Sequence, residues 1–470
     1  MRVAAVYDAA MNRWDAIVVG AGPAGLMAAQ RAAARGRKTL LIEKNRRPGI
    51  KIRLSGGTRC NLTHATDARG IVAAFGPAGR FLHSALAALG PQQVVDLFEA
   101  EGVPTKVEEG GKVFPRSDRA TDVLDALLRR LARTPCTLAC DAAVAEIKRI
   151  EGGFQLVMRE GDYPGSRGHH AQHGRENGAV PLACPSETPA RETVFTQSLI
   201  LATGGRSYPA CGTTGDGYRW AAALGHTVVA PRTALVPIAT HAAWVTALQG
   251  ITIADVRVKV VGPVLNRPSS EATCDAGRVG NSPYGQSLAE ACGSFLFTHF
   301  GVSGPVVLDV SRAVSGHAEP QSLVLVCDFL PEMTAEAIEA FLLRECAAAG
   351  KRQVAGILGQ LIPQRLAEAL MAAGSIPADC RAAEFARDDR RRLAQAVKAA
   401  AIPVAETLGF RKAEVTAGGV TLDEVDSRNM QSRLVPGLFF AGELLDLDGP
   451  IGGYNFQAAF STGWLAGENV

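Results

Sequence analysis

Two short apolar runs near the amino terminus predict buried strands with a helix between them. The first run is Ala16 to Val19, and the second is Thr39 to Ile42. A helix is predicted from about Pro23 to Arg35, and Gly36 is expected to end it as a C-cap. This order of strand, helix and strand predicts a βαβ unit.

The next part of the chain predicts a hairpin, a strand and a helix. The segments VAEIKRI and FQLVM are separated by EGG and predict the hairpin over residues 144–158. SLILATGGRS predicts a strand that runs into Gly204 and Gly205, and CGTTGDGYRWAAALGH predicts the start of a helix. Residues 160–192 are polar and rich in Gly, Pro and His, which predicts a loop.

An insert of two parts is predicted from about Pro231 to Pro403. The first part alternates as strands do, in ITIADVRVKVVG, GSFLFTHFG, PVVLDVS and SLVLVCDFL. The second part, Met333 to Ala401, has apolar residues at spacings of three and four and is predicted to be helical. Its basic run RDDRRR is most simply a solvated helix face.

Composition narrows the function classes only slightly. The chain has 49 Lys and Arg against 46 Asp and Glu, so its net charge of +3 gives no general case for a nucleic-acid or membrane partner.

The ten cysteines form no CxxC pair; Cys136 and Cys140, near the end of a helical pattern, are expected to be reduced. His169, His170 and His173 lack a further ligand at metal-binding spacing, so no metal is expected. Without an apolar run of membrane-spanning length, a cytoplasmic protein is expected.

The βαβ unit carries a dinucleotide-binding motif. Gly20, Gly22 and Gly25 form G-x-G-x-x-G between the first strand and the helix. The first glycine permits a tight turn, the second lets the backbone approach a pyrophosphate, and the third lets helix and strand pack closely. Glu43 ends the second strand, where a carboxylate accepts hydrogen bonds from a ribose diol.

The segment after Glu43 favours FAD over NAD. It reads KNRRPGIKIRLSGGTRCNLTH, where Lys51, Arg53 and Arg59 could face phosphates and residues 55–61 offer unhindered N–H groups. A cofactor that extends well past its pyrophosphate, as FAD does, suits such a segment. GTTGDG has the wrong spacing for a second dinucleotide motif, so NAD(P)H is expected to dock only transiently.

The carboxyl-terminal segment is predicted to close the cofactor site. The strand LFFAG is followed by Glu443, whose carboxylate can hold ribityl hydroxyls. A helix is predicted over Phe456 to Ala466, with its positive N-terminus toward the flavin N1–C2=O region. Gly452 and Gly453 allow the close approach.

Several of these segments resemble those of a known family. SGGTRCNLTH resembles the S-G-G-G-R-C-N-x-T segment of bacterial NAD(P)/FAD-dependent oxidoreductases, also called aminoacetone-oxidase-family FAD-binding enzymes, which include a bile-acid-pathway enone reductase. ALVPI, FTHFGVSGPVVLDVS, AEVTAGGV and FAGELLDLDGPIGGYNFQAAFSTG look like later blocks of the same family, so the similarity covers nearly the whole chain. Thr58, in place of the third glycine, and the long residues 160–192 depart from the pattern.

The resemblance implies an α/β fold: a glutathione-reductase-like FAD-binding Rossmann domain interrupted by an insert with a β-barrel part and a helical part. The expected segments are 12–230 (FAD-binding), 231–332 (β-rich insert), 333–403 (helical insert) and 404–470 (FAD-binding). By this resemblance, the backbone of Val144 is expected to contact the adenine.

The full set of residues expected to bind the cofactor is Gly20, Gly22, Ala24, Gly25, Glu43, Lys44, Lys51, Ser55, Gly56, Gly57, Thr58, Arg59, Cys60, Asn61, Val144, Thr203, Gly204, Gly205, Gly442, Glu443, Gly452, Gly453, Tyr454 and Asn455.

The leading hypothesis is an FAD-dependent oxidoreductase. Hydride would pass through flavin N5 to a small or medium organic substrate, such as a conjugated enone, bound between the flavin and the insert, with NAD(P)H as reductant. The alternatives are an FAD oxidase of amines that uses dioxygen and a flavoprotein with structural FAD that acts on RNA. The near-neutral charge weighs against RNA, and the oligomeric state is left open.

Four residues are candidates for the chemistry, each with a plain structural alternative. Cys60 is either a redox partner or, more simply, a packed thiol beside the cofactor. His299 and Ser303 lie in THFGVSG; the histidine is either a proton donor or a core residue. Tyr454 either shields the flavin ring or donates a hydrogen bond.

Overall fold

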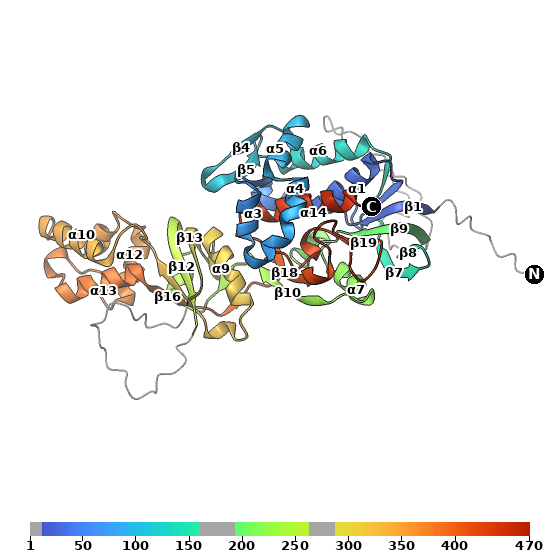
Figure 1. The fold of residues 1–470 in the computed structure, drawn as a ribbon. Coiled ribbons are helices and arrows are strands. Elements are labelled where there is room, and N and C mark those ends of the chain that lie inside the picture. Colours follow the sequence, from blue (N-terminus) through green and yellow to red (C-terminus); the bar gives the residue numbers. More distant parts are fainter. Residues whose placement is uncertain (1–11, 160–192, 263–286) are drawn as a thin grey trace, which may run out of the picture. The chain divides into compact units, whose positions relative to one another are not determined.

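The computed structural model describes residues 12–159, 193–262 and 287–470 (Figure 1). The loop predicted over 160–192, with its three histidines, lies outside the described residues. The chain divides into two compact units, the first made of Met1–Pro231 with Val415–Val470 and the second of Arg232–Glu414. The first unit is therefore assembled from both ends of the chain.

A seven-stranded sheet lies at the centre of the first unit. Its order is β6-β2-β1-β9-β8-β7, and β19 pairs with β9. The strands are β1 (Arg13–Val19), β2 (Thr39–Ile42), β6 (Cys136–Ala139), β7 (Val144–Ile150), β8 (Gly153–Met158), β9 (Thr193–Leu201) and β19 (Leu438–Phe440). The pairs of β1 with β2 and β9, of β2 with β6 and of β19 with β9 are parallel. The predicted strands and the β7–β8 hairpin are confirmed.

Strand β6 corrects one expectation from the sequence. Cys136 was expected near the end of a helical pattern, but the helix α6 ends at Ala132 and Cys136 begins a strand. Pro135 cannot continue a helix, and the residues after it pair with β2 from Thr39 to Ile42. The strand is short and half-buried at the sheet edge, so its own pattern is weak.

The helices α1 (Pro23–Ala34) and α14 (Tyr454–Glu468) pack against each other, and both were predicted. Two glycines of α14 permit this contact. A Cβ on Gly463 would lie 2.2 Å from the carbonyl oxygen of Ala24, and one on Gly467 would lie 2.3 Å from that of Ala28. The carboxyl-terminal helix is thus fixed against the helix of the dinucleotide motif.

Shorter elements complete the first unit. They are α2 (Ile50–Thr58), β3 (Thr63–His64), α3 (Ala68–Ala74), α4 (His83–Ala88), α5 (Pro91–Ala100), β4 (Thr105–Val107), β5 (Lys112–Pro115), α6 (Ala120–Ala132) and α7 (Asp216–Ala223). Strand β10 (Val228–Ala234) pairs with β18 (Val415–Val420) where the chain passes between the units.

The second unit has a β part and a helical part. Its antiparallel sheet has the order β16-β15-β12-β13-β14-β11-β17. These strands are β11 (Ile238–Ala239), β12 (Thr252–Val261), β13 (Ser287–Thr298), β14 (Gly301–Ser303), β15 (Val324–Asp328), β16 (Ala400–Pro403) and β17 (Glu406–Thr407). The helices are α8 (Ala243–Thr246), α9 (Pro305–Ser315), α10 (Ala335–Ala348), α11 (Val354–Leu358), α12 (Gln364–Ala373) and α13 (Arg387–Lys398).

Helix α9 corrects a second expectation, since PVVLDVS was predicted as a strand. Gly304, with φ 94°, is the N-cap, and Pro305 occupies the first helical turn, where its missing N–H costs nothing. The buried residues Val306, Val307, Val310 and Val314 follow helical spacing. A seven-residue window is too short to separate this pattern from the alternation of a strand.

The buried His226 makes the stability of the first unit sensitive to pH. Its Nδ1 lies 3.1 Å from Glu424 Oε2, and its Nε2 lies 2.8 Å from Ser432 Oγ. Burial lowers the pKa of His226 below its usual 6.5, although Glu424 opposes this shift. The unfolded chain therefore binds a proton more readily, and we expect the free energy of unfolding to fall as pH drops below about 6.5. Denaturant unfolding between pH 5 and 8 tests this; His226→Asn should flatten the profile, and an unchanged slope would contradict it.

Candidate FAD site

The turn between β1 and α1 contains three glycines that serve different purposes. Gly20 has φ +102°, and a Cβ there would lie 2.5 Å from the carbonyl oxygen of Ala202. A Cβ on Gly25 would lie 1.8 Å from the carbonyl oxygen of Gly20. At Gly22, a Cβ would meet no atom of the described residues within 4 Å. Packing explains Gly20 and Gly25, whereas the open space at Gly22 suits a pyrophosphate at the helix N-terminus.

The surroundings of this turn fit an anionic dinucleotide. The first turn of α1 has no acidic residue, and Gly22 has no side chain to cap it. Glu43 is 7% exposed; its Oε2 accepts from Ala21 N at 2.9 Å and its Oε1 from Asn45 N at 2.8 Å. Burial raises the pKa of Glu43, and the hydrogen bonds from Asn45 and Ala21 oppose this. Both oxygens retain lone pairs that a ribose hydroxyl can use.

The segment from Ser55 to Cys60 turns through left-handed backbone conformations. The φ values are 56° at Gly56, 66° at Gly57, 70° at Thr58 and 61° at Cys60. This run breaks α2 at Ser55, and the residues 56–58 are exposed. The segment therefore has the open, glycine-rich backbone that was expected of a cofactor loop.

Thr58 occupies a position that suits glycine. A β-branched residue at φ 70° is disfavoured by about 1–2 kcal/mol. Glycine removes this strain but costs about 0.5–1 kcal/mol, because it loses more conformational entropy when the chain folds. We expect Thr58→Gly to raise the free energy of unfolding by about 0.5–1 kcal/mol. Denaturant titration measures this; Thr58→Ala, which keeps the Cβ, should gain less. A loss of stability in the glycine variant would contradict the explanation.

Two basic side chains that were predicted to bind the cofactor, Lys44 and Arg59, form ion pairs with acids of the protein. Lys44 Nζ lies 2.8 Å from Asp216 Oδ2. Arg59 Nη1 lies 2.8 Å from Glu108 Oε1, while Arg53 is exposed and makes no ion pair within residues 12–159, 193–262 and 287–470. Lys44 and Arg59 are thus engaged in ion pairs within the protein.

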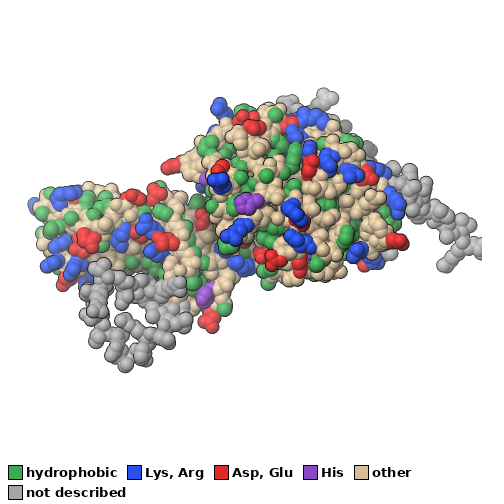
Figure 2. Space-filling view, in the orientation of Figure 1, with side chains coloured by type: hydrophobic (Ala, Val, Ile, Leu, Met, Phe, Trp, Pro, Cys, Tyr) green, Lys and Arg blue, Asp and Glu red, His purple; other side chains and the backbone are tan. Residues whose placement is uncertain are grey.

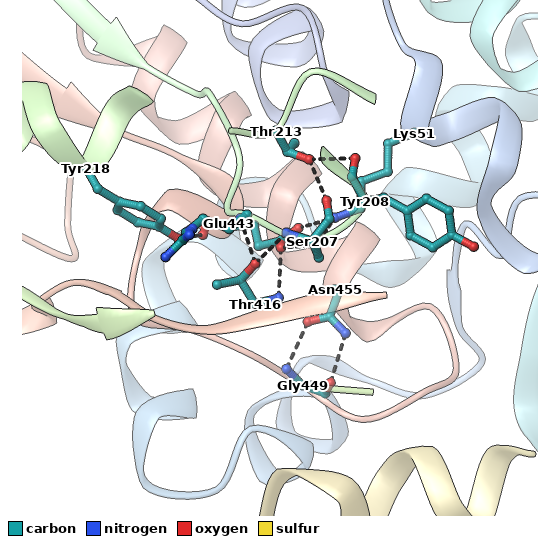
Figure 3. A network of polar contacts seen from close by, with 10 residues as sticks. Lys51, Ser207, Tyr208, Thr213, Tyr218, Thr416, Glu443, Gly449 and Asn455 are labelled. Carbon is teal, nitrogen blue, oxygen red and sulfur yellow. Dashed lines mark hydrogen bonds and ion pairs between the residues drawn. The ribbon is translucent and has the colours of Figure 1, made fainter. Parts of the chain in front are cut away.

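Glu443 is the centre of a polar network that joins three distant segments (Figure 3). Its Oε2 lies 2.7 Å from Lys51 Nζ on α2, and its Oε1 accepts from Ser207 Oγ at 2.8 Å and from Thr416 N at 2.9 Å. Lys51 Nζ also donates to Ser207 Oγ at 2.7 Å. Glu443 therefore holds the three segments together. Its contact with the ribityl chain stays a prediction.

Thr416 fixes the glycine turn that follows β9. Its Oγ1 accepts from Arg206 N at 2.8 Å and from Ser207 N at 3.0 Å. A Cβ on Gly205 would lie 2.3 Å from the same oxygen. Sequence reasoning did not single out Ser207 or Thr416, although both lie in quoted segments, because each bonds to residues outside its own segment.

The loop before α14 is bound to residues that follow the left-handed segment. Gly453 has φ +91°, and a Cβ there would lie 2.4 Å from the carbonyl oxygen of Thr63. With its amide oriented to satisfy its neighbours, Asn61 accepts from Gly453 N at 3.0 Å and donates to Thr63 O at 2.9 Å. Asn455 closes the loop: it accepts from Gly449 N at 2.8 Å and donates to Gly449 O at 2.9 Å (Figure 3).

His64 is a further residue at this loop that sequence reasoning did not single out. Its Nδ1 lies 3.1 Å from Gly452 O and therefore donates, since the carbonyl can only accept. Its ring stacks on Tyr454 with centroids 4.6 Å apart and planes at 19°. His64 is the last residue of the quoted segment SGGTRCNLTH, which was the only available signal.

The candidate chemistry residues fall into two groups. Cys60 is fully buried, and burial raises its thiol pKa to about 12, so it is a neutral thiol at neutral pH. Tyr454 is half-buried at the start of α14. His299 is exposed between β13 and β14 and Ser303 ends β14, so both belong to the second unit. Their roles stay predictions.

The remaining predicted contacts surround the carboxyl ends of the central strands. Val144 begins β7, Thr203 and Gly204 follow β9, and Gly442 follows β19. A Cβ on Gly442 would lie 2.8 Å from the Cβ of Ala24. Ligands of open parallel sheets bind outside these strand ends, where this set of residues lies.

The fold and this site define an FAD-dependent oxidoreductase of the Rossmann class. The chain belongs to the HI0933-like protein Rossmann domain family, whose model matches residues 14–165 and 183–469. FAD is the cofactor of this class, and the open backbone at Gly22 together with the donor groups above fits it.

Three relatives align along almost their whole length. The chain is 32% identical over 460 residues to the ribosomal RNA dihydrouridine synthase of Escherichia coli, covering 98% of each chain. It is 30% identical to the 3-dehydro-bile acid delta(4,6)-reductase of Clostridium scindens, covering 97% of this chain and 98% of the relative. It is 28% identical to the ribosomal RNA dihydrouridine synthase of Haemophilus influenzae, with the same coverage.

Every helix of the described residues is too short or too polar to cross a membrane. No group of three or more His, Cys, Asp and Glu residues in the same ranges could hold a metal ion.

Proposed function

We propose that the enzyme reduces a carbon–carbon double bond conjugated to a carbonyl group, with NAD(P)H as a transient reductant. When bound, FAD would supply hydride exchange at flavin N5. The observation that carries the proposal is the joining of Gly453, at the start of α14, to Asn61 and Thr63, because it brings a positive helix end to the glycine-rich loop. The protein's part is to position the reacting groups and favour negative charge there.

The names of the relatives support this bond type. Dihydrouridine is uridine whose ring double bond, conjugated to a carbonyl, has been reduced, and a delta(4,6)-reductase acts on double bonds of a 3-dehydro bile acid. Two of the three relatives are named for ribosomal RNA, at 32% and 28% identity. We therefore take a uridine in ribosomal RNA as the first candidate substrate.

A steroid-like enone is the second candidate, favoured by the 30% identical bile-acid reductase and by the near-neutral net charge of +3. On the face seen in Figure 2, basic and acidic side chains are interspersed among hydrophobic ones. An RNA substrate would therefore need a local basic surface rather than a generally basic protein.

The test is anaerobic turnover by the purified, FAD-loaded protein. NADH or NADPH should bleach the flavin, and in-vitro transcribed ribosomal RNA should restore its colour and yield dihydrouridine, measured by mass spectrometry of the nucleosides. Reoxidation by a 3-keto-Δ4 steroid, without RNA product, would select the second candidate. Peroxide formation from an amine in air, with no NAD(P)H bleaching, would contradict the reductase proposal.

A further inference from the structure

We infer that Arg46, Arg47 and Tyr208 form an RNA-binding edge beside the cofactor site, with the Tyr208 ring as a platform for a nucleotide base. This inference rests on the proposed RNA substrate. The first observation is the backbone of Tyr208, which has φ 54° and ψ 63°. Left-handed backbone is uncommon for a bulky residue, and such outliers cluster at functional sites.

The fold holds Tyr208 in this conformation from several sides. Its carbonyl oxygen accepts from Cys211 N at 2.8 Å and from Thr213 Oγ1 at 3.1 Å. The preceding Ser207 is bound to Lys51 and to Glu443 at 2.7 and 2.8 Å. Glycine would fit this turn without strain, so the turn alone gives no reason for a tyrosine.

The Tyr208 ring also does not pack in the core, so burial of the ring does not offset the backbone strain. The residue is 36% exposed, and its side chain points away from the network of Glu443 (Figure 3). It does not belong to the hydrophobic core of the first unit. A strained, solvent-facing aromatic side chain is what base stacking needs, since every base has a π-face.

The two arginines lie next to the Tyr208 turn. Asn45 Nδ2 donates to Cys211 O at 3.0 Å, so the segment that continues into Arg46 and Arg47 runs beside residues 208–211. Both arginines are exposed, and neither forms an ion pair with another described residue. They can therefore contact phosphates.

The acids of the adjoining segments form no ion pair with Arg46 or Arg47 in the described part of the chain, and this includes Asp141, whose N–H donates to Asn45 O at 3.1 Å. Glu43 is buried and accepts from Ala21 and Asn45. Asp216 is paired with Lys44 at 2.8 Å, and Glu443 is paired with Lys51 at 2.7 Å. The edge thus carries two arginines without an ion-paired acid among the described residues, beside an aromatic ring, a combination that suits single-stranded RNA.

The test compares KM and kcat for in-vitro transcribed ribosomal RNA. Tyr208→Gly removes the ring and relieves the backbone, so stability should hold while KM rises by about 10- to 100-fold with kcat within about threefold. Tyr208→Phe keeps the π-face and should stay within about twofold of wild type. The double variant Arg46→Gln with Arg47→Gln should raise KM. It should also make the slope of log(1/KM) against log salt concentration shallower by about 1.4, since two phosphate contacts are lost.

The matched control is Arg13→Gln with Arg149→Gln, two exposed arginines of the first unit. Arg13 begins β1, at the end opposite Gly20, and the pairing of β7, β8 and β9 places Arg149 in the row of Trp14. An equal rise of KM in the control variant, or an unchanged KM in Tyr208→Gly, would overturn the proposed RNA-binding edge while leaving the proposed function intact. A wild-type enzyme that forms no dihydrouridine would overturn the proposed substrate and the edge with it.

Discussion

Gly22→Val is expected to give a folded but colourless protein. A Cβ at this position would meet no described protein atom within 4 Å, so the side chain would project into the space left for the pyrophosphate. We expect FAD affinity to fall at least about 100-fold, equivalent to about 2.7 kcal/mol. The free energy of unfolding of the cofactor-free protein should change by no more than about 1 kcal/mol, the cost of a poorer N-cap residue. Flavin absorbance and denaturant titration measure the two effects.

Two other glycines serve as controls for this substitution. Gly356→Val, on α11, also has open space at its Cβ and should keep the flavin. Gly25→Ala should instead prevent correct folding, because its Cβ would lie 1.8 Å from the carbonyl oxygen of Gly20. If Gly22→Val bound FAD as tightly as wild type, the dinucleotide assignment of the turn would be wrong.

Glu443→Ala is expected to lower both the free energy of unfolding and the flavin content. The substitution leaves the Lys51 ammonium, the Ser207 hydroxyl and the Thr416 N–H without their shared acceptor. The two charged side chains are 24% and 19% exposed, which reduces the penalty below that of a fully buried pair. We expect the free energy of unfolding to fall by about 2–3 kcal/mol. Denaturant titration of the cofactor-free protein measures this.

A double-mutant cycle identifies the cause. Lys51→Met combined with Glu443→Ala should lose about 1–2 kcal/mol less than the sum of the single changes, since no charge is left unpaired. Glu101→Ala is the matched control: its 6% exposed carboxylate pairs with Arg130 and Arg133, away from the predicted loop, so stability should fall while flavin is retained. Strict additivity of the Lys51 and Glu443 changes would contradict the network's role.

The parts of the fold that were predicted correctly depend on local pattern. The strands around Val18 and Leu41, the helix α1 and the β7–β8 hairpin have apolar runs and turn residues that act over a few positions. The two errors, at β6 and at α9, occur where the segment is short. There the partner strand or the preceding Gly304 decides the conformation rather than the residues' own spacing.

The site divides in the same way. The roles expected of Gly20, Gly22 and Glu43 follow from one motif in which every residue is close in sequence. Ser207 and Thr416 were missed because a hydroxyl gives no signal until its partner is known. Each bonds to a residue about 27 to 236 positions away.

The sequence by itself determined that a dinucleotide turn begins this chain and that a glycine-rich loop and a second helix follow it, because backbone freedom and apolar spacing are local properties. Only the tertiary structure decided that Asn61 and Thr63 hold Gly453, that Glu443 joins three segments, and that Tyr208 is kept strained and exposed beside two arginines. These contacts join residues separated by up to about 390 positions, and their geometry exists only once the chain has folded.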